Sequence, residues 1–573
     1  MMRTLALAFG RFVLGAVLSL ALLSAALSQS VLHRGNNSEP DTLDPHKASG
    51  QWENNIISDM FVGLMTFDPK GQPILGAAES YEVSPDGLTY IFKIREGHLW
   101  SDGVPVTADD FVFSLRRIND PQTAAQYASI TFVVKNAEAV NAGRLPLDAI
   151  GARAIDAQTL EITLEHPAPF FPQLLTHYTM YPVPEHVVEA VGERWTKPGV
   201  MVSNGAYVLA QWNPNDVVRL VKNPHFYDAA EVSIDEVNFY PIQDVEATLK
   251  RFRAGELDTA NNFPRTQLPW LLANLPAETH VAPFILSMYV AFNTTRPPFD
   301  DMRVRQALGL AIDREFIVSR VLNAGETASY ALVPTGIVNY PATAQLRYKD
   351  VPLAERMERA KALLAEAGYG PNNPLRARFS IQNNADNKRL GVALQDSWRQ
   401  IGAAIEFDFT ESKVHYNNLR QQNYDFAWAG WIADYNDAKN YLYLGETRSA
   451  EMNYMKWSNA TYDQLIQEAD ATADLTLRAQ IMSRAEQILL DEAPMVPVYY
   501  GTSRNLVQSY IAGWEDNPVD VHRTRFLSFS GPRRVPVPVA EAAREAEAQA
   551  EDEQSWSGWF WGGVCAWTGL GCF

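Results

Sequence analysis

One aspartate stands in a setting that favours cation binding. Asp434 lies between Trp431 and Tyr435 in the segment GWIADYND, residues 430–437. A carboxylate enclosed by aromatic side chains loses hydration, which costs free energy unless a cation supplies a charge-assisted hydrogen bond. Aspartate also caps helices and forms turns. The residues alone therefore leave two roles open for Asp434, a cation anchor or a turn residue.

Catalytic and cofactor signatures are absent from the chain. It has no HExxH, GxSxG, GxxxxGK[ST], CxxC or GxGxxG pattern, and its ten histidines include no helix-spaced pair suited to a metal. The only cysteines, Cys565 and Cys572, stand near the end, so the main body has no disulfide and no thiolate metal site. We expect a non-enzymatic protein without metal or cofactor, with a hydrolase as the alternative.

Size and charge restrict the class further. A chain of 573 residues is several times the usual size of one domain, so two or three packed lobes are expected. The formal net charge is -19. Nucleic-acid binding needs concentrated Lys and Arg, so nucleic acid is not an expected partner.

The elements that must position Asp434 follow an α/β pattern. Residues 88–94 alternate as a strand does, and residues 160–165 alternate similarly. A helix is predicted after Thr107, whose hydroxyl can cap it. Further helices are predicted at 301–322, 353–368 and, with a break, 461–491.

Both ends of the chain differ from the body. Residues 1–28 have basic Arg3 and Arg11, an apolar run and the ending Ala26-Leu27-Ser28, which predicts an export signal cleaved after Ser28; a membrane anchor is the alternative. No cysteine lies near that point, so a lipoprotein is not expected. Residues 532–573 predict a linker and a Trp- and Cys-containing tail, which either docks on a membrane or importer, or folds back or is disordered.

Several further segments carry a resemblance that covers nearly all of residues 32–529. With GWIADYND they match, in order, the extracytoplasmic solute-binding proteins of peptide ABC importers, solute-binding family 5. The segments are RGNNSEPDTLDPHK (34–47), LWSDGVPVTADDFVFSLRRINDP (99–121), SNGAY (203–207), VKNPHFYD (221–228), FDDMRVRQAL (299–308) and APMVPVYY (493–500).

The resemblance implies a periplasmic-binding-protein type II clamshell, with three lobes in two hinged halves. Lobe I would take residues 29–61, 188–287 and 501–531. Lobe II, an insertion, would take 62–187, and lobe III 288–500. Ligand would bind between the halves and stabilise their closure.

The resemblance also assigns residues. The aspartate at the position of Asp434 takes the ligand's α-ammonium group in this family. The backbone of Gly430 and Trp431 would pair with an extended ligand as an added strand does. Other family pocket positions, for each of which core packing or turn formation is the alternative, fall on Ile432, Tyr127, Asn261, Tyr289, Gln51 and Ser49.

Departures from the family concern the other end of the ligand. Where peptide-binding members carry an arginine two residues before the Gly-Trp pair, this chain has Trp428, so one counter-charge for a carboxylate is missing. Ser49, Ser412 and Gly501 replace larger or charged pocket residues, and Arg420 could compensate from nearby. We expect the amine end to be recognised, and ligand length and carboxyl recognition stay open.

The implied function is a monomeric periplasmic receptor that captures short peptides and delivers them to the permease and ATPase subunits of an ABC importer. A close variant binds another amine-bearing solute, such as a murein peptide or an opine. A different class is a periplasmic chaperone or signalling partner.

Overall fold

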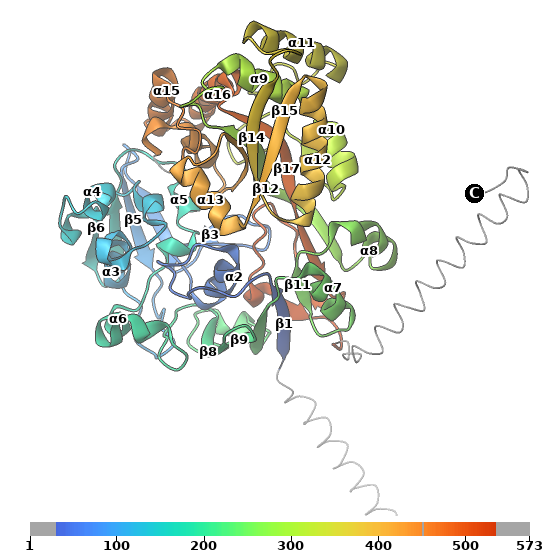
Figure 1. The fold of residues 1–573 in the computed structure, drawn as a ribbon. Coiled ribbons are helices and arrows are strands. Elements are labelled where there is room, and N and C mark those ends of the chain that lie inside the picture. The colour runs from blue at the N-terminus through green and yellow to red at the C-terminus, as the bar shows by residue number, and fades with distance from the viewer. Residues whose placement is uncertain (1–29, 450–451, 534–573) are drawn as a thin grey trace, which may run out of the picture.

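A large mixed sheet organises the computed structural model, which describes residues 30–449 and 452–533 (Figure 1). The strand order is β15 (Ala403–Thr410), β14 (Leu375–Gln382), β16 (Phe426–Ile432), β12 (Thr279–Phe292), β17 (Met495–Val507), β11 (Thr259–Asn261), β1 (Val31–Asn36), β10 (Glu236–Pro241), β9 (Val217–Lys222) and β8 (Tyr207–Asn213); β13 (Thr327–Ala328) pairs with β17. The pairs β14/β15, β14/β16, β1/β10 and β1/β11 are parallel.

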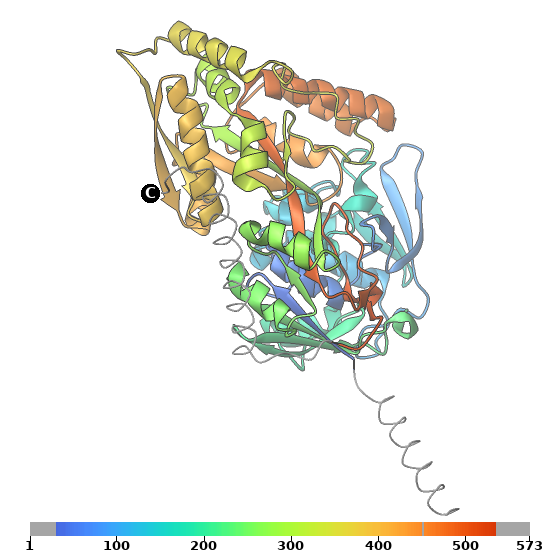
Figure 2. The same cartoon turned by 90° about the vertical axis from the view of Figure 1, so that its right-hand side faces the viewer.

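Two long strands connect the two ends of this sheet. β12 has 14 residues and β17 has 13, and they pair antiparallel from Thr279 opposite Leu506 to Ala291 opposite Met495. Figure 2 shows β17 running from the top of the molecule to its lower part. In the orientation of Figure 1, we call the part around β14–β16 the upper lobe and the part around β1 and β8–β11 the lower lobe.

A separate sheet forms what we call the small lobe. Its order is β4 (Ala78–Val83), β5 (Thr89–Ile94), β7 (Thr159–Thr163) and β6 (Ala152–Asp156), beside α3 (Ala108–Asn119) and the short elements β2 (Met65–Phe67), β3 (Pro73–Leu75), α4 (Ala137–Asn141) and α5 (Phe171–Leu174). The predicted strands β5 and β7 are confirmed, and α3 begins after Thr107 as predicted. Its first turn is fixed by Asp110, whose Oδ2 accepts the Thr107 N–H at 2.8 Å.

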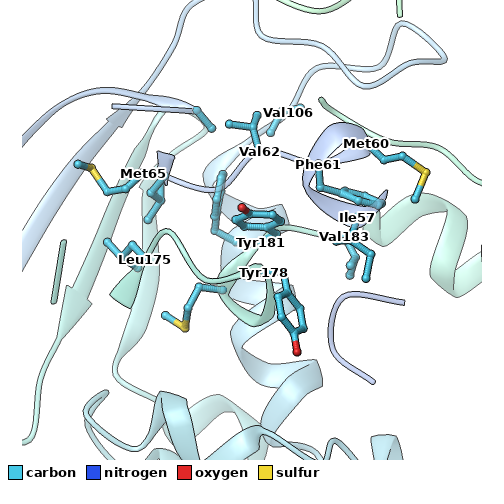
Figure 3. Close-up of a cluster of buried hydrophobic side chains, with 14 of the residues drawn as sticks. Ile57, Met60, Phe61, Val62, Met65, Val106, Leu175, Tyr178, Tyr181 and Val183 are labelled. Carbon is cyan, nitrogen blue, oxygen red and sulfur yellow. The ribbon is translucent and has the colours of Figure 1, made fainter. Parts of the chain in front are cut away.

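The small lobe shares a core with the lower lobe. Helix α2 (Gln51–Met60) of the lower lobe and the turn η4 (Tyr178–Met180) of the small lobe contribute to one buried cluster, in which Phe61, Val62 and Val183 lie around Tyr181 (Figure 3). The Tyr178 hydroxyl donates to the Ala48 carbonyl at 3.2 Å. Residues 177–181 are therefore packed against the lower lobe.

Helices cover the rest of the sheet. In the upper lobe they are α9 (Met302–Ala311), α10 (Arg314–Phe316), the π-helix η8 (Ile317–Leu322), α11 (Leu353–Glu366), α12 (Ala385–Gln400), α13 (Ser412–Gln421), α14 (Lys439–Leu442), α15 (Ala460–Asp470) and α16 (Leu475–Glu492). The lower lobe carries α6 (Glu185–Val191), α7 (Val245–Arg253) and α8 (Leu268–Asn274). The predicted helices at 353–368 and 461–491 are confirmed.

The single helix predicted at 301–322 is wrong, because the chain breaks at Ile312 and Asp313. The Asp313 side chain accepts the Phe316 N–H at 3.0 Å and starts a new helix. Arg314 turns inward, fully buried, and its Nε donates to the carbonyls of Ser329 and Pro497, both at 2.9 Å. These contacts favour a bend over a continuous helix.

Among the helices described, none is both long and apolar enough to cross a bilayer. The predicted export signal and residues 534–573 of the predicted tail lie outside the described part of the chain.

A buried carboxylate in α16 holds a loop of the upper lobe. Glu486 Oε1 accepts the N–H groups of Leu332 and Val333 at 2.8 and 2.9 Å, and Oε2 accepts the Tyr340 hydroxyl. We expect Glu486→Ala to lower the free energy of unfolding by about 3 kcal/mol or more, because it leaves these buried donors unsatisfied. Glu486→Gln keeps an acceptor oxygen and should cost much less. Equal losses in urea denaturation would contradict this account.

The same variants test a pH effect. Burial raises the pKa of Glu486 from 4.5 to about 7. A carboxyl whose folded pKa is raised contributes stability that is present below pH 4.5 and is lost as pH rises through about 7. Denaturation of the wild type should show this loss between these pH values, whereas Glu486→Gln should lack it.

Candidate ligand-binding site

Asp434 follows β16 and is held in place by Asn440 of α14. The Asp434 N–H donates to Asn440 Oδ1 at 3.0 Å, and Asn440 Nδ2 donates to Asp434 Oδ2 at 3.3 Å. Asn440 Oδ1 also accepts the indole N–H of Trp431 at 2.7 Å. The structure thus fixes both the backbone and the carboxylate of Asp434, whose side chain is only 16% exposed.

Aromatic side chains from two lobes enclose this carboxylate. His177 of the small lobe places Nε2 4.0 Å from Asp434 Oδ1, and its ring lies against Tyr127 and Tyr178. The remaining wall comes from the upper lobe. Burial raises the pKa of each surrounding tyrosine and the charge of Asp434 adds to the effect; these residues are Tyr127, Tyr178, Tyr435, Tyr441 and Tyr443.

The electrostatics of the site favour the binding of a cation. Burial raises the pKa of Asp434 from 3.8 to about 6, partly offset by the Asn440 hydrogen bond. Burial lowers the pKa of His177 to about 3, so the imidazole is neutral at pH 7 and makes no ion pair at 4.0 Å. Among the described residues, no Lys or Arg pairs with Asp434. At neutral pH the site presents a desolvated negative charge to an incoming ammonium group.

A second contact joins the small and upper lobes beside Asp434. Phe170 of the small lobe stacks on Tyr435, with ring centroids 5.1 Å apart and planes 10° from parallel. The guanidinium carbon of Arg478 lies 5.2 Å from the centroid of the Phe170 ring. Asp437 accepts two hydrogen bonds from Arg478, at 2.7 and 2.9 Å. The contacts of Phe170 with Tyr435 and Arg478 cross from the small lobe to the upper lobe and mark a closed conformation.

The other predicted residues of β16 and β12 divide between different environments. Trp431 is buried near Asp434, Gly430 lies opposite Met288, and Ile432 is 44% exposed. Trp428 and Tyr289 are both fully buried in the upper-lobe core, where Trp428 packs on Tyr499. The structure therefore does not bring Trp428 and Tyr289 to the Asp434 carboxylate.

The remaining predicted residues are spread along the lobe boundary. Ser49 is exposed, and Gln51 begins α2 and reaches Asp520 at 3.4 Å. Asn261 pairs with Asn505 at the end of β17. Arg420 is exposed on α13.

Arg420 nevertheless faces the aromatic wall. Burial raises the pKa of Tyr127, Tyr416 and Tyr454, and the positive charge of Arg420 partly offsets this in each. Tyr127 and Arg420, which are 293 positions apart in the sequence, are therefore brought to one place.

Sequence reasoning missed three residues of this site, namely His177, Phe170 and Asn440. Asn440 lies six positions after Asp434 and its role depends on the turn between them. His177 and Phe170 reach Asp434 and Tyr435 only through the packing of the small lobe on the upper lobe. No local pattern around either residue signals this contact.

A groove of about 470 Å³ lies elsewhere in the upper lobe, over the polar sides of β14 and β15. It shares no residue with the surroundings of Asp434, and its charges are mixed and mostly exposed. It is lined by Arg296, Arg376, Ala377, Arg378, Ser380, Ala404, Glu406, Asp408, Asn423, Tyr424 and Asp425. We therefore place the candidate site at Asp434.

Lobes that meet over a desolvated carboxylate, joined by long strands, define a solute-binding protein. Residues 72–452 match the family described as bacterial extracellular solute-binding proteins, family 5 Middle. The chain is 36% identical over 500 residues to the periplasmic oligopeptide-binding protein OppA of Salmonella typhimurium, covering 86% of this chain and 91% of that protein. It is also 36% identical over 496 residues to the probable deoxycholate-binding periplasmic protein YgiS of Escherichia coli, covering 86% and 92%. The chain belongs to solute-binding protein family 5.

Solved structures confirm the predicted type II fold. Haemophilus influenzae OppA in complex with the peptide RPPGFSPFR matches with a TM-score of 0.80 at 33% identity, covering 88% of this chain and 99% of that one. The murein tripeptide binding protein MppA of Escherichia coli matches at 0.80, and its unliganded open form at 0.73, both at 32% identity and 88% coverage of this chain, with 99% and 98% of those chains covered. The lower score for the open form agrees with the closed contacts described above.

Proposed function

We propose that this chain is the periplasmic substrate-binding protein of an ABC importer and that it captures short peptides between its lobes. The observation that carries the proposal is Asp434, a buried carboxylate without a Lys or Arg partner among the described residues, enclosed where two lobes meet. The peptide complex of a relative supports the ligand class. Closure over a peptide ammonium would supply the missing counter-charge.

The route to the importer is part of the same proposal. Residues 1–28 would direct export and be removed, and the mature monomer would begin near Gln29. The lobes would divide at the boundaries predicted from the family, with 62–187 as the insertion and 288–500 as the opposing lobe. The permease would recognise the closed form, and the importer's own ATPase would hydrolyse ATP.

Ligands carried by the protein provide the test. We expect mass spectrometry of the material released on denaturing protein from periplasmic extracts to show short peptides with free amino ends. Thermal unfolding of the dialysed protein should then shift upward with tri-alanine. If deoxycholate but not tri-alanine raised the unfolding temperature, the ligand would be an amine-free anion and not a peptide. Long, unfolded segments would indicate a chaperone, and progressive cleavage of added peptide a hydrolase.

A further inference from the structure

A second charged group at the lobe boundary has no ion-pair partner of its own. Arg504 lies in β17 opposite Val281, and its carbonyl accepts the Asn262 N–H. Its guanidinium carbon is 6.0 Å from the centroid of the Phe263 ring. Nη1 is buried and has no hydrogen-bond partner, and among the described residues no carboxylate forms an ion pair with this side chain.

The neighbouring arginine is different in this respect. Arg265 donates from Nε to Asp386 Oδ2 at 2.7 Å and also contacts the carboxylate of Glu326. Two acids therefore contact Arg265. Asp386 also acts on the neighbouring Arg504, but its two oxygens accept from Arg265 and Arg389, so Arg504 has no acid of its own. Burial and the charge of Arg265 lower the pKa of Arg504 to about 10, an effect that Asp386 offsets in part, and Arg504 stays protonated at neutral pH. A buried cation of this kind is stabilised by an anion that accepts from its free N–H groups.

Strand register places Arg504 within reach of a ligand anchored at Asp434. The N–H of Ala433, the residue before Asp434, donates to the Ile285 carbonyl, and Arg504 pairs with Val281, four residues further along β12. A β-bulge between Pro283 and Ser287 sets four residues of β12 against two of β17, so the offset along the strands is about three residues at about 3.3 Å. With two strand spacings of about 4.8 Å, the two backbone positions lie roughly 14 Å apart. An extended peptide covers about 3.3–3.6 Å per residue. Three to five residues, with the two side chains, would span the gap.

Tyrosines lie near both charged groups. Asp434, Tyr454 and Arg420 all act on the pKa of Tyr127, while Tyr416 acts on those of Tyr454 and Tyr499. The pKa of Tyr499 is raised by burial and lowered in part by Arg265 and Arg504.

We propose that Arg504, with Arg265 beside it, binds the carboxylate of the ligand whose ammonium group meets Asp434. The inference rests on the proposed function and narrows it: the ligand is a zwitterion with a free carboxyl end, a short peptide of about three to five residues. Arg504 thereby supplies a counter-charge for which Arg420, exposed on α13, is the competing candidate.

The test is a charge-deletion comparison at the carboxyl end. Calorimetry would give the Kd of tri-, tetra- and penta-alanine, each as free acid and as C-terminal amide, for the wild type, Arg504→Gln and Arg420→Gln. For the best length we expect the wild type to prefer the free acid by about 10- to 100-fold, the range of a charge-assisted hydrogen bond. Arg504→Gln should abolish this preference while keeping the affinity for the amide, and Arg420→Gln should keep the preference.

Other outcomes separate the two proposals. No acid–amide preference in the wild type, or a preference that survives Arg504→Gln and vanishes in Arg420→Gln, would overturn the role of Arg504 and leave peptide capture intact. Binding of none of these peptides would count against peptide capture itself. Arg504→Gln should unfold at or above the wild-type temperature, because it removes a buried unpaired charge. If Arg504→Gln fails to fold, the Arg504→Lys variant is measured instead and should bind the free acid more tightly than the amide.

Discussion

A peptide with a free amino end is expected to bind the Asp434→Asn variant about two to three orders of magnitude more weakly than the wild type. Asn keeps the shape and the contacts with Asn440, but it leaves the ligand's ammonium group enclosed with a neutral partner. Breaking an enclosed charge pair costs about 3–5 kcal/mol, and each 1.4 kcal/mol is about tenfold in affinity. Calorimetry with a peptide known to bind measures the loss.

Acetylation of the peptide's amino end supplies the control. It should weaken binding to the wild type strongly and add little in Asp434→Asn, because both changes remove the same pair. Unfolding of the ligand-free variant should stay close to wild type. Full affinity of the wild type for the acetylated peptide would mean that Asp434 is a structural turn residue.

The same variant should change how the ligand-free protein closes. Burial in the closed form raises the pKa of Asp434 from 3.8 to about 6, a difference equivalent to about 3 kcal/mol. Because the closed-form pKa is raised, this contribution to closure is present below pH 3.8 and is lost as pH rises through about 6. Small-angle scattering of the ligand-free wild type should show a smaller radius at pH 4 than at pH 7.5. Asp434→Asn should show no such difference.

The sequence predicted the parts that depend on neighbours along the chain. Alternating apolar residues predicted β5, and the segment at Thr107 predicted the start of α3. The aromatic residues beside Asp434 indicated the charged centre of the site. The break before Arg314 was missed, because it depends on carbonyls of Ser329 and Pro497 that come from distant segments.

The two-residue alternation of a strand did not indicate which residues of β12 and β16 are buried. Residues 289–292 of β12 and 426–429 of β16 are buried on both faces of the sheet, so neither face is marked there by polar residues. Family position alone suggested Tyr289 and Trp428 as pocket residues, and the pattern gave no sign that both are fully buried in core clusters. Arg504 in β17 was missed for another reason, because its surroundings come from the distant residues Phe263 and Arg265.

Removing the Phe170 side chain is also expected to weaken peptide binding strongly. In the closed form Phe170 is buried between Tyr435 and the guanidinium of Arg478, whereas separation of the lobes would expose it. Burial of a Phe contributes about 1.5–3 kcal/mol, and the cation–π contact adds about 1 kcal/mol. Phe170→Ala should therefore weaken peptide binding by roughly 60- to 700-fold through the closing equilibrium.

The readouts of this variant distinguish closure from damage to the site. Phe170 does not touch the ligand's ammonium group in this account, so the ratio of affinities for free and acetylated peptide should stay at the wild-type value. Scattering at moderate ligand concentration should show a larger open fraction, which saturating ligand reverses. Phe316→Ala, a change at a 49% exposed aromatic of the upper lobe, should alter neither. Wild-type peptide affinity in Phe170→Ala would show that the contact of Phe170 with Tyr435 and Arg478 forms without stabilising closure. Loss of the affinity difference between free and acetylated peptide would place Phe170 in the ammonium site instead.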